Sequence, residues 1–141
     1  MISQVIVDTG PLIALIDHSD QHHAWVRSRF EEIAPPLQTC EAVLTEACHL
    51  ARRLPGGVSA ILGLFEQGVC VITFDLTPNL DKVSAAMQQY STVPMSLADA
   101  CLVRMSELIT AGTVLTLDGD FRIYRRHKRK NIPLLIPPPE A

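Results

Sequence analysis

The sequence predicts an α/β fold, namely a three-layer α/β/α sandwich around a central, mainly parallel sheet of about five strands. Uncharged runs of β-branched and aliphatic residues recur along the chain, which is typical of strands buried on both faces. Segments with helical periodicity separate these runs, so we expect helical crossovers between parallel strands. A chain of 141 residues suits one domain, predicted over residues 1–141 with a core from about 4 to 137.

The N-terminal third begins with an apolar strand, Val5–Asp8, and a short helical turn, Pro11–Ile16. An amphipathic helix over Asp20–Ile33 follows. Pro35-Pro36 ends it, because the residue before a proline disfavours helical geometry. A short strand, Leu37–Thr39, is expected next.

Two helices then lead to the middle of the chain. The first spans Cys40–Leu54 and stops at Pro55-Gly56-Gly57. The second spans Val58–Gln67, and Gly68 follows it in the position where a left-handed cap is common.

The C-terminal half continues the alternation of strands and helices. A strong strand, Val69–Phe74, precedes a helix over Thr77–Tyr90 that opens with a capping threonine and a proline. The next helix, Ser96–Ile109, opens with the Ser-x-x-Asp pattern of a capping box. A strand over Thr113–Asp118 and an edge strand over Leu134–Ile136 complete the predicted sheet.

The composition is that of a globular protein, with 48% hydrophobic and 19% charged residues. No apolar stretch approaches the roughly 20 residues that cross a bilayer, and residues 1–4 resemble no signal peptide. We therefore expect a cytoplasmic protein without a membrane partner. The cysteines, Cys40, Cys48, Cys70 and Cys101, show no Cys-x-x-Cys spacing, so a zinc or redox motif is not supported. We expect reduced thiols, buried at Cys48, Cys70 and Cys101, each of which lies in an apolar stretch.

Acidic residues stand where the first and the last strong strand end. Asp8 follows Val5-Ile6-Val7, and Asp118 closes the strand that begins at Thr113. Because the carboxyl ends of parallel strands face the ligand crevice, both acids are expected at one site. Clustered carboxylates oppose folding unless a cation or a proton compensates them.

Two further acids extend this pattern. Asp99 lies in the first turn of its helix, and Glu46 lies at the edge of an apolar helix face, beside Val43 and Leu50. Each acid alone has a simpler interpretation, as a capping or turn residue or as a solvated helix residue. Their joint occurrence with the strand ends favours a shared site.

Four segments together resemble the PIN domain family and, within it, the VapC-type toxins of toxin–antitoxin pairs. They occur in the family's order over about residues 4 to 137, and they are Val7-Asp8-Thr9-Gly10, Glu46 in its helix, Ser96–Ala100 and Leu115–Phe121. The resemblance implies that Mg²⁺ or Mn²⁺ is held by Asp8, Glu46, Asp99 and Asp118. It places supporting hydroxyls at Thr9 and Thr116 and a possible further ligand at Asp120, whereas Phe121 is expected to pack in the core.

The resemblance further implies a metal-dependent endoribonuclease that is a toxin, binds a cognate antitoxin and forms a homodimer. The residues themselves argue only for metal-assisted phosphoryl chemistry, since oxygen ligands select hard cations. Asp8 is the expected ligand shared by two ions, and Glu46 a ligand or a base. A non-catalytic RNA-binding or regulatory module is the alternative. A phosphatase is expected to have an Asp-x-Asp pair after the first strand, and a receiver domain is expected to have a lysine after a late strand. Neither pattern is present.

Half of the basic residues gather in one segment, although the net charge is −3. They are Arg122, Arg125, Arg126, Lys128, Arg129 and Lys130. This segment could be a solvated helix or loop face, a surface that follows RNA phosphates with Tyr124 stacking on a base, or a site for an acidic antitoxin tail.

A histidine-rich segment, Asp17–His23, is the rival metal cluster. Ser19 or Asp20 as helix cap would leave His18 outside the helix, so a polar helix start is the preferred interpretation.

Overall fold

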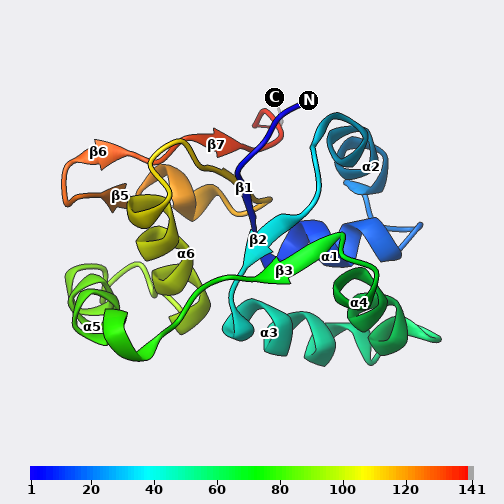
Figure 1. Cartoon of the computed structure of the whole chain (residues 1–141), viewed down its shortest axis with the longest axis horizontal. Helices are drawn as coiled ribbons and strands as arrows, with labels where there is room; N and C mark the ends of the chain where they lie inside the picture. Colours follow the sequence, from blue (N-terminus) through cyan, green and yellow to red (C-terminus); the bar gives the residue numbers. More distant parts are fainter. Residues whose placement is uncertain (140–141) are drawn as a thin grey trace.

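The computed structural model, which describes residues 1–139, contains a five-stranded sheet in the order β3-β2-β1-β4-β7 (Figure 1). All four strand pairs are parallel. The strands are β1 (Val5–Val7), β2 (Leu37–Thr39), β3 (Cys70–Ile72), β4 (Thr113–Leu115) and β7 (Leu134–Leu135). The predicted fold class is confirmed.

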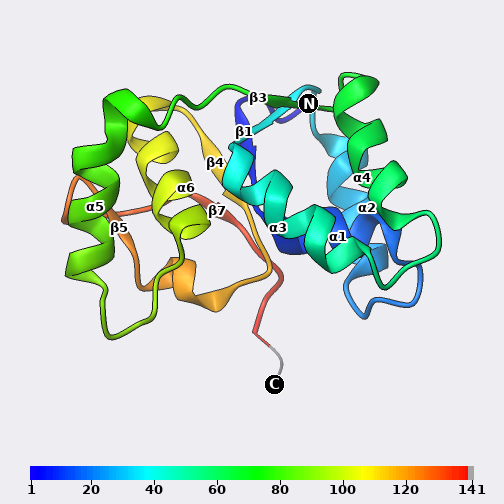
Figure 2. The ribbon, with the colours of Figure 1, turned by 90° about the horizontal axis from the view of Figure 1, so that it is seen from below.

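Helices cover both faces of this sheet. They are α1 (Thr9–Ile16), α2 (His23–Glu32), α3 (Glu41–Ala51), α4 (Gly57–Glu66), α5 (Leu80–Gln89) and α6 (Leu97–Leu108). Figures 1 and 2 show α5 and α6 on one side of the sheet and α1 to α4 on the other, which is the expected three-layer arrangement. None of the helices within residues 1–139 combines the length and the apolar run that crossing a bilayer requires.

The core is centred on β1, whose three residues are fully buried. Leu102 and Met105 of α6 and Leu12 of α1 are buried in the same cluster. The middle strand is therefore enclosed from both sides, as its unbroken apolar sequence predicts. Whether residues 1–141 form one domain stays a prediction, and residues 140–141 lie outside the described part of the chain.

Two helices begin at residues other than those predicted, because aspartate side chains accept hydrogen bonds from backbone amides near the start of each helix. Helix α1 starts two residues early, since Asp8 accepts a hydrogen bond from the Thr9 amide at 2.7 Å. Helix α2 starts at His23 rather than Asp20. Asp20 accepts from the His22 amide at 2.8 Å and closes a turn instead of starting the helix. The predicted cap at Ser19 or Asp20 is therefore wrong.

The predicted helix over residues 77–90 is divided in two. Its threonine and proline lie in a 3₁₀ turn, η1 (Thr77–Asn79), and α5 begins only after it. Asn79 holds this junction, since its side-chain amide donates to the Asp75 carbonyl at 2.8 Å and its oxygen accepts from Arg104 at 2.9 Å. The helix start is thus fixed by a contact with α6.

The last strands also differ in detail from the prediction. Strand β4 ends at Leu115, and the next three residues form the turn into η2 (Gly119–Arg122). The basic segment is neither a helix nor a simple loop, because β5 (Arg125–Arg126) and β6 (Lys130–Asn131) pair as an antiparallel hairpin.

Candidate active site

Asp8 and Asp118 meet where the chain reverses its direction across the sheet. The chain adds β2 and β3 on one side of β1 and then places β4 on the other side. Such a switch point opens a crevice at the carboxyl ends of the strands. Asp8 directly follows β1, and its amide donates to the Leu115 carbonyl of β4 at 3.0 Å. Asp8 follows its strand as predicted, whereas Asp118 lies in the turn after β4 and not at the end of the strand; both acids nevertheless line one hollow.

Asp8 is only 7% exposed and is held by two hydrogen bonds. One carboxylate oxygen accepts from the Thr9 amide at 2.7 Å, and the other accepts from the Thr116 hydroxyl at 2.7 Å. The Thr116 oxygen also accepts from the Asp118 amide at 3.0 Å. Thr116 therefore connects the two acids and fixes the orientation of the Asp8 carboxylate.

Asp99 combines the capping and the site interpretations. Its amide donates to the Ser96 hydroxyl at 3.0 Å, and its Oδ2 atom accepts from the Ser96 amide at 3.2 Å, which is the predicted capping box. The Tyr124 hydroxyl donates to the same oxygen at 3.1 Å. Within residues 1–139 the other oxygen, Oδ1, accepts no hydrogen bond, so it is the atom available to a ligand.

Glu46 reaches the same place from the middle of α3. The Thr9 hydroxyl donates to its Oε1 atom at a long 3.5 Å. Its neighbour Leu50 is 45% exposed, so the expectation that Leu50 belongs to the buried face of this helix is wrong. Val43 and Ala47 are buried as predicted, which leaves Glu46 at the rim.

All four predicted acids surround one hollow of about 300 Å³. It is lined by Asp8, Thr9, Gly10, Glu46, Leu50, Asp99, Leu117 and Asp118. Asp120 is not among the lining residues, and its amide donates to Asp118 at 2.9 Å. Sequence reasoning missed Gly10, Leu117 and the exposed Leu50, although the first two adjoin predicted site residues.

The model of the PIN domain family matches residues 5–126 of the sequence. This chain belongs to the PIN domain family. A solved structure of Mycobacterium tuberculosis VapC20, described as a toxin that cleaves the sarcin-ricin loop, has the same fold with a TM-score of 0.71. Its sequence is 18% identical, and the match covers 82% of this chain and 91% of that one. None of the curated proteins matches this sequence.

Burial and mutual repulsion raise the proton affinity of the acids in this PIN domain. Burial raises the pKa of Asp8 to about 6, and the charges of Asp99 and Asp118 add to the rise, against the hydrogen bonds from Thr116 and Thr9. Burial is also the main reason why the pKa values of Glu46 and Asp99 lie above their ordinary range. The four acids therefore lack a nearby positive charge that would compensate their own.

The donor set suits a hard divalent cation. Four carboxylates line the hollow without a histidine or cysteine among them, and oxygen-only sites favour Mg²⁺ or Mn²⁺ over zinc. No salt bridge within residues 1–139 involves any of the four. In the same part of the chain, no three acidic, histidine or cysteine groups converge tightly enough to enclose one ion. The carboxylates thus surround the hollow rather than meet at one point.

Tyr124 is fully buried and cannot stack on a base, so this expectation is wrong. Its ring packs edge-on against Tyr90 and Phe121, each at 5.1 Å between centroids. Phe121 lies in the core as predicted. Tyr124 instead supports the site through its hydrogen bond to Asp99, and no local sequence pattern signals this role.

The basic segment does not line the acidic hollow. Three of its arginines bind backbone carbonyls. The Arg125 guanidinium donates to the carbonyls of residues 122–124 at 2.6 to 3.0 Å, and that of Arg126 donates to Ser106 and Thr110 at 3.2 Å. Arg122 binds the Pro137 carbonyl, whereas Lys128, Arg129 and Lys130 are exposed.

The side chains of the histidine-rich segment contact residues close to it in the structure. His23 lies 2.7 Å from the Ala14 carbonyl through Nδ1 and stacks on His18 with 4.6 Å between ring centroids. Asp17 accepts from Ser19 and faces Arg53 at 3.4 Å. Of the cysteines, Cys70 and Cys101 are buried as expected, Cys48 is only half-buried, and Cys40 is buried as well.

Proposed function

We propose that this PIN domain is an Mg²⁺- or Mn²⁺-dependent endoribonuclease that hydrolyses RNA phosphodiester bonds. The observation that carries the proposal is the group of four uncompensated carboxylates at the switch point of the sheet. Membership of the PIN family supports it, and so does the shared fold with a toxin described as cleaving an RNA loop.

In the proposed mechanism Asp8, Asp99 and Asp118 would bind the divalent metal directly, and Glu46 would act on it through a water molecule. A bound divalent ion would polarise the scissile phosphate and lower the pKa of the attacking water. Thr116 keeps Asp8 in its orientation, and Tyr124 does the same for Asp99. Because both hydrogen bonds to the Asp99 carboxylate reach Oδ2, its Oδ1 atom would be free to bind the ion.

Glu46 is the proposed proton acceptor of the reaction. It lies at the rim, and its one side-chain hydrogen bond among residues 1–139 is the long one from Thr9. Its Oε2 atom accepts no hydrogen bond within residues 1–139, so a water molecule can approach it, and a carboxylate in that position can take a proton from the water.

The direct test is incubation of the purified protein with RNA in Mn²⁺ or in EDTA. We expect cleavage in Mn²⁺ that is absent in EDTA and is abolished by Asp99→Asn. Glu66→Gln, at an exposed position of α4 outside the hollow, serves as the control. RNA that stays intact in Mn²⁺ while it still binds would instead favour a non-catalytic RNA-binding or regulatory module.

We further propose that the protein is the toxin of a toxin–antitoxin pair, acts in the cytoplasm as a homodimer and binds a cognate antitoxin. The supporting observation is the fold shared with VapC20. In this proposal the basic segment, from Arg122 to Lys130, follows the RNA backbone. Its exposed members, Lys128, Arg129 and Lys130, contribute most, because Arg125 and Arg126 are occupied by carbonyls. Growth arrest on expression, relieved by Asp8→Asn, would support the toxin role.

A further inference from the structure

A second concave site, which shares no lining residue with the acidic hollow, lies between α5, α6 and the β5–β6 hairpin. It has a volume of about 250 Å³. Its cationic side chains come from three separate elements, namely Lys82 of α5, Arg104 of α6, and Arg125 and Lys128 of the hairpin. Small apolar residues such as Ala86 and Val103 line the rest. We name this feature the basic groove.

The basic groove has little compensation for its positive charge. Arg104 pairs with Glu107 at 3.2 Å, the one acid that lines the groove. No salt bridge within residues 1–139 involves Lys82, Arg125 or Lys128. Lys82 and Lys128 are both exposed. In a protein of net charge −3, such a group of cations indicates an anionic partner.

The hairpin wall of the groove is fixed in place. Glu107 accepts from the His127 amide at 2.6 Å, so the hairpin tip is bound to α6. The Arg126 guanidinium also joins the hairpin to the end of α6, through the Ser106 and Thr110 carbonyls. His127 and Lys128 have φ values of 51° and 68°, and this left-handed backbone is unfavourable for both residues. The groove is therefore preorganised.

The basic groove adjoins the acidic hollow through α6 and the aromatic cluster. Ala100 and Arg104 line the groove, and Asp99 on the same helix lines the hollow. At a rise of about 1.5 Å per residue, Arg104 lies roughly 7.5 Å along the helix from Asp99. Tyr90, a groove residue, packs on Tyr124, which binds Asp99. One extended polymer can thus reach both sites.

We propose that the basic groove binds the phosphate backbone of single-stranded RNA, at nucleotides that flank the bond cleaved at the hollow. The proposal deepens the proposed function and rests on it. Continuity along α6 favours RNA over an acidic peptide, because the same strand then supplies the anion for the groove and the phosphodiester for the hollow. The small apolar residues leave room for a sugar or a base beside the cations.

The test is RNA binding by Lys82→Ala/Lys128→Ala in EDTA, measured by fluorescence anisotropy with a uridine oligonucleotide of about 20 residues. Alanine at residue 128 retains a Cβ atom, so the left-handed backbone is no more strained than before. We expect roughly tenfold weaker binding at low salt. The slope of log K against the logarithm of the salt concentration should be shallower by about 1.4, because two phosphate contacts are lost. In Mn²⁺ the same variant should show a raised KM for RNA.

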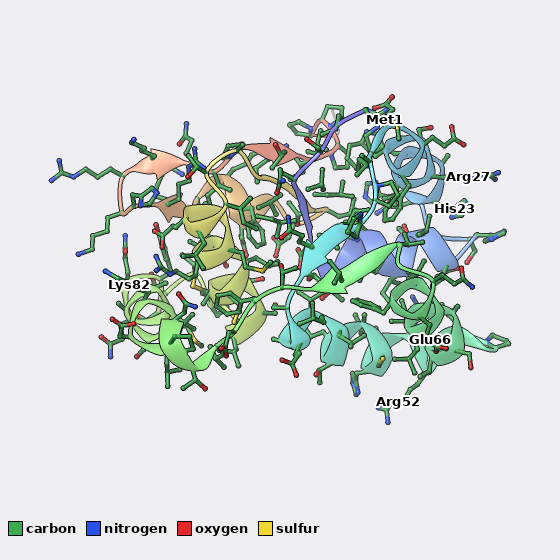
Figure 3. All side chains as sticks on the ribbon, viewed as in Figure 1. Met1, His23, Arg27, Arg52, Glu66 and Lys82 are labelled. Carbon is green, nitrogen blue, oxygen red and sulfur yellow. The ribbon has the colours of Figure 1, made fainter. Side chains whose placement is uncertain are left out.

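The matched control is Arg27→Ala/Arg52→Ala, which removes the same charge from exposed cations. Figure 3 shows Arg27 and Arg52 at the opposite end of the molecule from Lys82. Equal loss of binding in both double variants, or unchanged binding in the groove variant, would overturn the proposal. The proposal would also be overturned if polyglutamate displaced the bound oligonucleotide as effectively as unlabelled RNA does at equal total charge. If RNA remains uncleaved in Mn²⁺ but binding still depends on the groove, the nuclease function fails and the groove assignment stands.

Discussion

Asp8 shows that a residue placed for the chemistry of the site can lower the stability of the fold. Its pKa is raised from an ordinary 3.8 to about 6, so between these values the folded protein binds a proton more readily than the unfolded chain. The free energy of unfolding therefore increases as the pH falls from about 6 toward 4, and the full penalty is present above 6. By linkage that penalty is on the order of 2 to 3 kcal/mol for the metal-free protein.

Asp8→Asn should therefore abolish cleavage and stabilise the metal-free fold at pH 7 by about 1 to 2 kcal/mol. The amide can keep both hydrogen bonds, because its oxygen accepts from Thr9 and its nitrogen donates to Thr116, which has a further lone pair. Urea unfolding in EDTA at several pH values measures the effect. The gain in stability on acidification should be smaller in the variant than in the wild type. An identical pH profile for both proteins would contradict this account of Asp8.

Tyr124→Phe tests whether a buried phenol positions a metal ligand. The change removes the donor to Asp99 and leaves the packing of the ring intact. We expect a loss of roughly tenfold in RNA cleavage and a higher Mn²⁺ concentration for half-maximal activity, as for other outer-shell partners of metal ligands. The stability loss should stay near 1 kcal/mol.

Tyr90→Phe is the matched control for this experiment. Tyr90 belongs to the same aromatic pair, but its hydroxyl accepts from the Arg125 amide and contacts no acid. A purely structural effect would appear in both variants, whereas a shift in the Mn²⁺ requirement should appear only in Tyr124→Phe.

At the scale of elements, the start of α6 serves both folding and the site. The capping box that begins the helix also holds Asp99 at the rim of the hollow. Ser96→Ala should lower the free energy of unfolding by about 1 kcal/mol, because one amide at the helix start loses its acceptor. Ser84→Ala, at an exposed position within α5, should be neutral or slightly stabilising, since alanine is the better helix former. Equal effects in denaturant unfolding would contradict the capping role.

The strands and the four acids could be predicted because their signals are local. An unbroken apolar run predicts a buried strand, and parallel order then places Asp8 and Asp118 at one edge. The start of α2 could not be predicted in this way, because aspartates favour a turn and a helix cap by the same hydrogen bond. Asp20 forms the turn.

The hairpin and the role of Tyr124 depend on contacts between distant segments. The run Arg125–Lys130 has no apolar alternation and no glycine, so no short-range hairpin signal is present. Its docking depends on Glu107 and on the α6 carbonyls bound by Arg126. Tyr124 is a buried partner of Asp99 only because the chain around β5, which Tyr124 directly precedes, lies against α6 in three dimensions. Tertiary contacts of this kind leave no pattern in a single sequence.

At the scale of the whole molecule, unlike charges are kept apart instead of being paired. The acids of the hollow and the lysines of the basic groove form none of the salt bridges found within residues 1–139. Pairing them would relieve the repulsion within each group. Their separation leaves one site open to cations and another to phosphates, which is the arrangement that the proposed nuclease function requires.

Divalent cations should consequently stabilise the whole fold and not only support cleavage. An ion that binds the folded acids but not the unfolded chain raises the free energy of unfolding by RT ln(1 + [M]/Kd), about 2.7 kcal/mol at a hundredfold excess over Kd. Mg²⁺ or Mn²⁺ should therefore raise the melting temperature, measured by calorimetry. NaCl at equal ionic strength should do so much less, because the proposed oxygen-ligand site would bind a divalent ion specifically, whereas Na⁺ would only screen the surface charges. Asp8→Asn should melt higher than the wild type in EDTA yet gain little from Mn²⁺, because it has already lost the charge that the ion compensates. A wild-type protein that gains no more from Mn²⁺ than from Na⁺ would show that the four carboxylates do not form a metal site.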